Sequence, residues 1–150
     1  MKIAMMGSGG VGGFFGGRLA NAGYDVSFIA RGAHLTAMRE RGLTIENAAQ
    51  GDIHVPKVHA TDDPASLGPI DLVILSVKLW DTEAAANAIK PIVGPRTGVL
   101  SLQNGVIKDD ILRRVLPESA VMGGVAYVAT HISRPGVIHQ VGTMQRIVVG

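Results

Sequence analysis

The chain has 150 residues, of which 47% are hydrophobic and 17% charged; this excludes intrinsic disorder and suits one domain of about 100 to 150 residues. The formal net charge is only +2 and the basic residues are dispersed, which argues against a nucleic-acid-binding protein. Because cysteine is absent, disulfides, thiolate metal sites and a cysteine nucleophile are excluded.

Short apolar runs alternate with helical periodicity, a pattern typical of βα units around a parallel sheet. Such runs are nearly continuous in apolar residues, as expected for strands buried on both faces. Strands are predicted at Lys2–Met6, Val26–Ala30, Asp71–Val77 and Gly98–Leu102, with a further strand beginning near Val121. The predicted fold is α/β, a Rossmann-type doubly wound, mostly parallel sheet with helices on both faces.

Four helices are predicted between these strands by apolar residues at helical spacing. They are expected from Val11 to Ala22, from about Ala33 to Arg41, between Asp81 and Pro91, and across Ile107–Val115. The first two end at glycines, Gly23 and Gly42. Asp81 is the expected N-cap of the third helix.

Two segments depart from this alternation. The segment from Leu43 to Pro64 holds two short extended runs among turn residues, and we interpret it as a surface excursion attached to the sheet. Near the end, Gly136–Val141 and Arg146–Val149 are predicted as two strands joined by a turn near Gly142. Because the chain stops directly after an apolar strand, we expect residues 1–150 to be a fragment.

The first residues could also be read as a secretory leader, since no charge follows Lys2 until Arg18. However, seven of the eleven residues from Gly7 to Gly17 are glycine, which makes a poor apolar helix. No apolar run approaches the roughly 20 residues of a membrane span. We therefore expect a cytoplasmic protein with no membrane partner.

The segment Gly7-Ser8-Gly9-Gly10-Val11-Gly12 follows the first strand and opens the first helix, which is the setting of a dinucleotide-binding G-x-G-x-x-G loop. In such loops the first glycine permits the turn, the second lets the backbone approach the pyrophosphate, and the third lets the helix lie close to the strand. The alternative is a glycine-rich turn that binds nothing. Gly13, Gly16 and Gly17 would each cost about 0.8–1 kcal/mol in a helix, so close packing there is expected in either case.

Arg31 follows the second strand, 19 residues after Gly12, where an NAD site usually has an acid for the ribose 2′-hydroxyl. A guanidinium can instead hold a 2′-phosphate through charge-assisted hydrogen bonds. The sequence therefore favours NADP, with a solvated arginine as the alternative.

Lys78 and Asn104 follow the strands Asp71–Val77 and Gly98–Leu102, at the edge of the sheet where ligands of open α/β folds bind. An exposed lysine and an Asn-Gly hairpin turn are the structural alternatives. The five histidines show no metal-ligand spacing, and the chain has no G-x-S-x-G nucleophile elbow, so neither a metal site nor a hydrolase is expected. Asp62 and Asp63 are expected in a turn or cap.

These segments together resemble the N-terminal half of the ketopantoate reductase (2-dehydropantoate 2-reductase) family. The resemblance rests on the glycine loop, Ala30-Arg31-Gly32, Ser76-Val77-Lys78, Gln103-Asn104-Gly105-Val106 and Gly136-Val137-Ile138-His139. It covers all 150 residues, and the glycine loop alone would not select this family.

The resemblance implies NADPH-dependent reduction of 2-dehydropantoate to pantoate on the route to pantothenate and coenzyme A, and it allows a homodimer. It implies that Gly7–Gly12 hold the pyrophosphate, that Arg31 meets the 2′-phosphate and that Lys78 assists on the cofactor. It also implies that Asn104 lies between nicotinamide ribose and substrate and that Ala129 lies near the nicotinamide. The proton-donor lysine and the substrate carboxylate partners are expected beyond Gly150 in a helical second domain, so the isolated chain is expected to be inactive. The alternatives are a reductase of another 2-keto acid and a non-catalytic NAD(P)-binding or sensing module.

Overall fold

The computed structural model describes all residues from 1 to 150, and its centre is a seven-stranded sheet with the order β11-β8-β7-β6-β1-β2-β5. Every neighbouring pair is parallel except β8 with the edge strand β11. The strands are β1 (Lys2–Met6), β2 (Asp25–Ile29), β5 (His59–Thr61), β6 (Leu72–Leu75), β7 (Gly98–Ser101), β8 (Val121–Tyr127) and β11 (Arg146–Val149). The predicted mostly parallel α/β sheet is confirmed, and the strand bounds agree with prediction within two residues.

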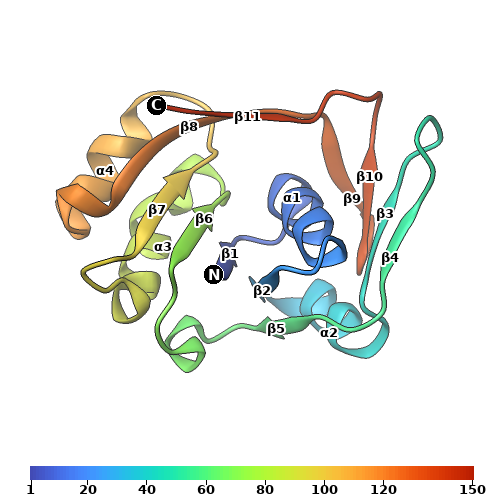
Figure 1. The fold of residues 1–150 in the computed structure, drawn as a ribbon, viewed down its shortest axis with the longest axis horizontal. Helices are drawn as coiled ribbons and strands as arrows, with labels where there is room; N and C mark the ends of the chain where they lie inside the picture. Colours follow the sequence, from blue (N-terminus) through green and yellow to red (C-terminus); the bar gives the residue numbers. More distant parts are fainter.

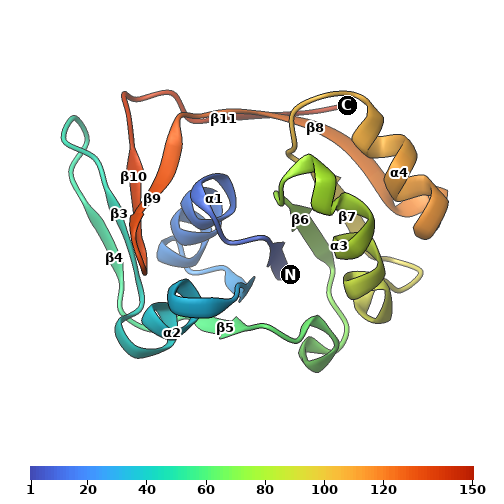
Figure 2. The same ribbon diagram turned by 180° about the vertical axis from the view of Figure 1, so that it is seen from behind.

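Helices cover both faces of this sheet (Figures 1 and 2). Helices α1 (Gly10–Asn21) and α2 (Gly32–Arg41) share one buried cluster, in which Phe14, Phe28 and Met38 are almost wholly buried. Helices α3 (Thr82–Ile89) and α4 (Ile107–Val115) pack on the opposite face around a second cluster. Four single 3₁₀ turns lie at Pro64–Leu67, Leu79–Asp81, Lys90–Ile92 and Glu118–Ala120. The 150 residues contain no helical second domain, and no helix is both long and apolar enough to cross a membrane.

The segment predicted as a surface excursion is instead part of the core. Its strands β3 (Leu43–Glu46) and β4 (Ile53–Val55) join β10 (Val137–Gln140) and β9 (Thr130–Arg134) in a second sheet with the order β4-β3-β10-β9. Leu43 and Ile45 alternate with Thr44 and Glu46, so that one face of β3 is fully buried. The prediction was wrong because this alternation lasts only four residues and its main partner, β10, lies far along the chain.

The two strands at the end of the chain exist, but they do not form a hairpin with each other. β10 pairs in parallel with β3, whereas β11 runs antiparallel to β8 in the first sheet. Figure 1 shows the chain crossing between the two sheets after β10. The turn at Gly142, which has a positive φ of 73°, therefore redirects the chain to another sheet.

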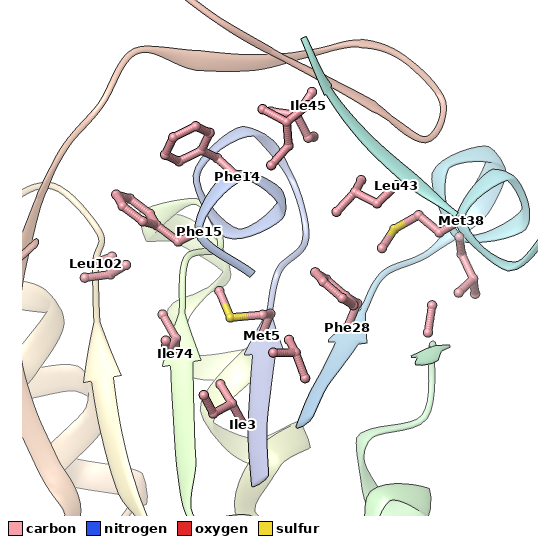
Figure 3. Packing of buried hydrophobic residues seen from close by; sticks show 14 of the residues in the cluster. Ile3, Met5, Phe14, Phe15, Phe28, Met38, Leu43, Ile45, Ile74 and Leu102 are labelled. Atoms are coloured by element: carbon pink, nitrogen blue, oxygen red, sulfur yellow. The ribbon is translucent and has the colours of Figure 1, made fainter. Parts of the chain in front are cut away.

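Helix α1 lies between the two sheets, and its glycines permit this close packing. A Cβ on Gly16 would lie 2.6 Å from Phe28 in the first sheet, and one on Gly13 would lie 2.7 Å from Ile138 in the second. A Cβ on Gly17 would lie 2.9 Å from Ile45. Figure 3 shows Phe28 and Ile45 on different sides of this helix. The cost of these helical glycines is thus offset by contact with both sheets.

Candidate functional site

The three pattern glycines of the G-x-G-x-x-G segment between β1 and α1 are under three different constraints. Gly7 has a φ of +91°, and a Cβ there would lie 2.8 Å from the side chain of Val77. A Cβ on Gly12 would overlap the carbonyl oxygen of Gly7 and the hydroxyl of Ser76. A Cβ on Gly9 would meet no atom within 4 Å. Packing within the chain therefore explains the first and third glycines, whereas Gly9 is free on the side that a ligand would approach.

The N-terminus of α1 is not capped by any side chain. Gly9 stands at the N-cap, and the first turn of the helix contains no acidic residue. The first N–H groups of a helix lack partners within the helix, and the dipole places partial positive charge there. This end of α1 can therefore accept a phosphate group.

A cleft of about 600 Å³ opens at this turn. It lies along the carboxyl ends of β1, β2 and β6 and is bounded on one side by β9 of the second sheet. Seven residues of the predicted site line it: Gly7, Ser8, Gly9, Gly10, Val11, Arg31 and Lys78. The fold thus brings residues from three βα junctions to one hollow.

Arg31 and Lys78 are the two basic side chains of the cleft, and neither forms an ion pair within the protein. Arg31 occupies the N-cap of α2, directly beyond β2, and is exposed. Lys78 precedes the 3₁₀ turn after β6. Asp62 and Asp81 also line the cleft, so the free cations are accompanied by two carboxylates. A phosphorylated ligand would have both guanidinium and ammonium groups available to it.

His34 joins the glycine loop to the second sheet. Its Nδ1 accepts a hydrogen bond from the backbone N–H of Gly136 at 3.0 Å, which leaves Nε2 to donate to the carbonyl of Ser8 at 2.7 Å. Burial lowers the pKa of His34, and the hydrogen bond to Ser8 opposes this shift only in part. Ser8 itself is buried, and its hydroxyl donates to the carbonyl of Ile29 at 3.0 Å. The Ser8 side chain therefore holds the loop to β2.

Three predicted site residues lie outside the cleft lining. Gly12 sits behind the loop against Ser76. Asn104 is exposed after β7, beside Gly105 with its φ of +91°, and α4 rather than a strand follows it, so the turn is not a hairpin. Ala129 is exposed between β8 and β9, next to Thr130, which does line the cleft. The roles of Asn104 and Ala129 remain predictions.

Two expected capping roles have different outcomes. Asp63 caps the 3₁₀ turn at Pro64 by accepting from the N–H of Ala65 at 3.2 Å, which confirms the expected cap. Asp81 stands at the N-cap of α3, as predicted, although its side chain makes no capping hydrogen bond. The hydroxyl of Thr82 contacts the carbonyl of Leu79 instead.

Other cleft residues were not singled out from the sequence as site residues. The hydroxyl of Ser76 donates to the carbonyl of Gly7 at 2.7 Å and so fixes the glycine loop on β6. The carbonyl of Thr130 packs against Gly10, where a Cβ would lie 2.7 Å from it. His34 follows Arg31 by three residues, and that spacing on the first turn of a helix was the available signal.

The residues that line the cleft fit the phosphate groups of a dinucleotide. The open side of Gly9, the uncapped helix end and two unpaired basic side chains are what a pyrophosphate with a further phosphate requires. Thr130, which also lines the cleft, has a buried hydroxyl with no hydrogen-bond partner in the chain.

Comparisons of the sequence and of the structure with known proteins agree with one another. Residues 3–150 match the family described as "Ketopantoate reductase PanE/ApbA". The chain is 38% identical to the 2-dehydropantoate 2-reductase of Pyrococcus horikoshii, over 92% of this chain and 44% of that protein. The crystal structure of a PanE/ApbA family ketopantoate reductase from Ralstonia eutropha JMP134 has a TM-score of 0.88 and 45% identity, covering 95% of this chain and 47% of that one.

A structure of D-mandelate dehydrogenase with NADH and anilino(oxo)acetate is also similar. Its TM-score is 0.87 at 26% identity, covering 95% of this chain and 46% of that one. The chain thus spans about half the length of the relatives it matches.

Proposed function

This chain belongs to the ketopantoate reductase family, and we propose that residues 1–150 form the NADPH-binding part of a 2-keto acid reductase. The proposed substrate is 2-dehydropantoate, which would be reduced to pantoate on the route to pantothenate and coenzyme A. The relatives that carry this activity are about twice as long as the chain. By likeness to the family, the proton-donor lysine is expected in the part of these relatives that this chain does not cover.

The observation that carries the proposal is the position of Arg31 in the glycine-loop cleft. Arg31 is unpaired, and it lies directly beyond β2, where dinucleotide folds recognise the adenosine ribose. No acid follows β2 to accept a hydrogen bond from a 2′-hydroxyl. A charge-assisted hydrogen bond contributes about 1.5–3 kcal/mol, which is about 10- to 150-fold in affinity. This supports NADPH over NADH.

The proposed roles follow from the positions of the side chains. The N–H groups at the start of α1 would bind the pyrophosphate, Arg31 would bind the 2′-phosphate, and Lys78 would hold the cofactor from the β6 side. By likeness to the family, Asn104 would orient the nicotinamide ribose and substrate, and Ala129 would lie near the nicotinamide. Bound NADPH would supply a hydride to the 2-keto carbon.

A titration of the chain with NADPH and with NADH tests this proposal. Trp80 is the only tryptophan and lies two residues after Lys78, so its fluorescence should be quenched as the cofactor binds. We expect saturable quenching with at least tenfold tighter binding of NADPH. An unchanged signal at saturating NADPH, with the fold intact by circular dichroism, would contradict the proposal.

A second candidate is an NADH-dependent dehydrogenase of another 2-hydroxy acid. The structural similarity to D-mandelate dehydrogenase with NADH favours it, as do Asp62 and Asp81 in the cleft, because carboxylates oppose a 2′-phosphate. Tighter binding of NADH than of NADPH in the same titration would select this candidate.

A further inference from the structure

The side-chain amide of Gln103 connects the end of β7 to the loop that follows β6. Gln103 is only 7% exposed, and its Nε2 donates to the carbonyl of Val77 at 2.9 Å and to the hydroxyl of Thr82 at 2.8 Å. A longer contact of 3.3 Å reaches the carbonyl of Lys78. Its Oε1 accepts from the hydroxyl of Ser101 at 3.1 Å.

The directions of these hydrogen bonds are fixed by the neighbouring groups. The hydroxyl of Thr82 already donates to the carbonyl of Leu79 at 2.6 Å, so the Thr82 oxygen must accept the hydrogen bond from Nε2 of Gln103. The backbone carbonyls of Val77 and Lys78 can only accept. The nitrogen of Gln103 must therefore face the β6 loop, and the amide cannot be reversed without leaving several buried groups unsatisfied.

Every acceptor of the Gln103 nitrogen lies on residues 77–82, the segment that carries Lys78 into the cleft. Gln103 also precedes Asn104 directly in the chain. One buried amide thus joins the backbones that bear Lys78 and Asn104. If this position only had to fill space, an apolar side chain of similar volume would do so without the cost of burying an amide.

We propose that Gln103 is a positioning residue, which holds residues 77–82 so that the ammonium of Lys78 meets the bound cofactor at a fixed distance from Asn104. This inference rests on the proposed function of the cleft. Gln103 acts through Lys78 and makes no contact with the cofactor itself. Its loss would therefore weaken NADPH and NADH equally and leave the preference set at Arg31 unchanged.

A double-mutant cycle on the 150-residue chain tests the proposal. Gln103→Met keeps the length of the side chain and removes the amide, while Gln145→Met, at an exposed position, is the control. We expect Gln103→Met to raise the Kd for both cofactors about tenfold and to have little effect when Lys78→Met is already present. Equal losses in both backgrounds, or no loss in either, would overturn the proposal.

Trp80 gives a second measurement that requires no cofactor, because it lies between Lys78 and Thr82, within the segment that Gln103 holds, and is 81% exposed. Its fluorescence anisotropy should fall in Gln103→Met and remain unchanged in Gln145→Met. Unchanged anisotropy in Gln103→Met would overturn the proposal even if cofactor binding fell. If Gln103→Met does not fold, the shortened amide of Gln103→Asn is expected to give the same two effects. A wild-type chain that binds neither cofactor would instead overturn the proposed function, and the restraint on Trp80 would still be measured separately.

Discussion

His34 and Gly136 are 102 residues apart in the chain, yet the Nδ1 of His34 accepts the N–H of Gly136 at 3.0 Å. Through its other nitrogen the same ring contacts the carbonyl of Ser8. The imidazole therefore holds the turn between β9 and β10 against the glycine loop and keeps the second sheet as a wall of the cleft. A neutral ring satisfies both contacts, whereas a protonated ring would place an N–H opposite the N–H of Gly136.

Protonation of His34 should therefore lower the free energy of unfolding of the protein in mild acid. Burial lowers the pKa of His34 in the folded chain, while the unfolded chain keeps a value of about 6.5. Between these two pKa values the unfolded state binds more protons, so the free energy of unfolding rises with pH there. The full contribution is present above about pH 6.5 and is lost as the pH falls through the folded pKa. Urea unfolding between pH 7.5 and 5.0 measures this loss.

His34→Gln should remove this part of the pH dependence. The variant should also be less stable at pH 7.5 by about 1–2 kcal/mol, because two hydrogen bonds to backbone groups are disturbed. The control is His131→Gln, at an exposed position on β9. A His34→Gln variant whose unfolding free energy follows pH as steeply as the wild type would contradict this assignment.

Arg31→Ala should reduce the ratio of NADPH to NADH affinity by about 10- to 150-fold, mainly by weakening NADPH. The loss should shrink as salt is added, because Arg31 is exposed and its charge is screened. Titrations at low and high ionic strength, followed by Trp80 fluorescence, measure both effects. Arg96→Ala is the matched control, since Arg96 is exposed and lies outside the cleft lining. An unchanged ratio in Arg31→Ala would remove Arg31 from the 2′-phosphate site.

Lys108 is a buried lysine that contacts the carboxyl end of β7. It is 4% exposed, and its Nζ donates to the carbonyls of Ser101 at 3.1 Å and Gly124 at 2.6 Å, where β7 separates from β8. Lys108→Met would leave both carbonyls without this donor, so we expect a loss of about 2 kcal/mol in unfolding free energy. Lys90→Met, at an exposed position, should change it by less than about 0.5 kcal/mol. A Lys108→Met chain as stable as the wild type would show that the carbonyls find other partners.

The parts of the fold that the sequence predicts well are those whose signals are local. The strand Lys2–Met6, the glycine loop and the following helix are specified by contiguous residues, and the structure has them at nearly the predicted bounds. The burial of β6 and β7 likewise follows from their runs of apolar residues. Arg31 and Lys78 lie in one cleft, as the sequence predicts from the rule that ligands bind at the carboxyl ends of parallel strands.

The parts that could not be predicted depend on pairing between distant segments. β3 is held by β10, so the burial of Leu43 and Ile45 is decided by residues about 90 positions away. The role of His34 likewise depends on Gly136, which is 102 residues away, so the spacing of His34 from Arg31 could not by itself predict that role. The position of Asn104 relative to a ligand depends on the surroundings of an exposed turn, which residue spacing does not specify.

Alanine at Gly9 and alanine at Gly12 should separate ligand binding from folding within one loop. At Gly12 the new methyl group would overlap the carbonyl of Gly7 and the hydroxyl of Ser76, so Gly12→Ala should lower the free energy of unfolding by about 1–3 kcal/mol. At Gly9 the methyl group would meet no protein atom within 4 Å, and φ is −75°, so stability should change by less than about 1 kcal/mol. The same methyl group would occupy the space proposed for the pyrophosphate, and Gly9→Ala should therefore lose most NADPH binding. Thermal unfolding and NADPH titration of both variants measure these effects. A Gly9→Ala chain that binds NADPH as the wild type does would mean that no phosphate approaches the loop at Gly9.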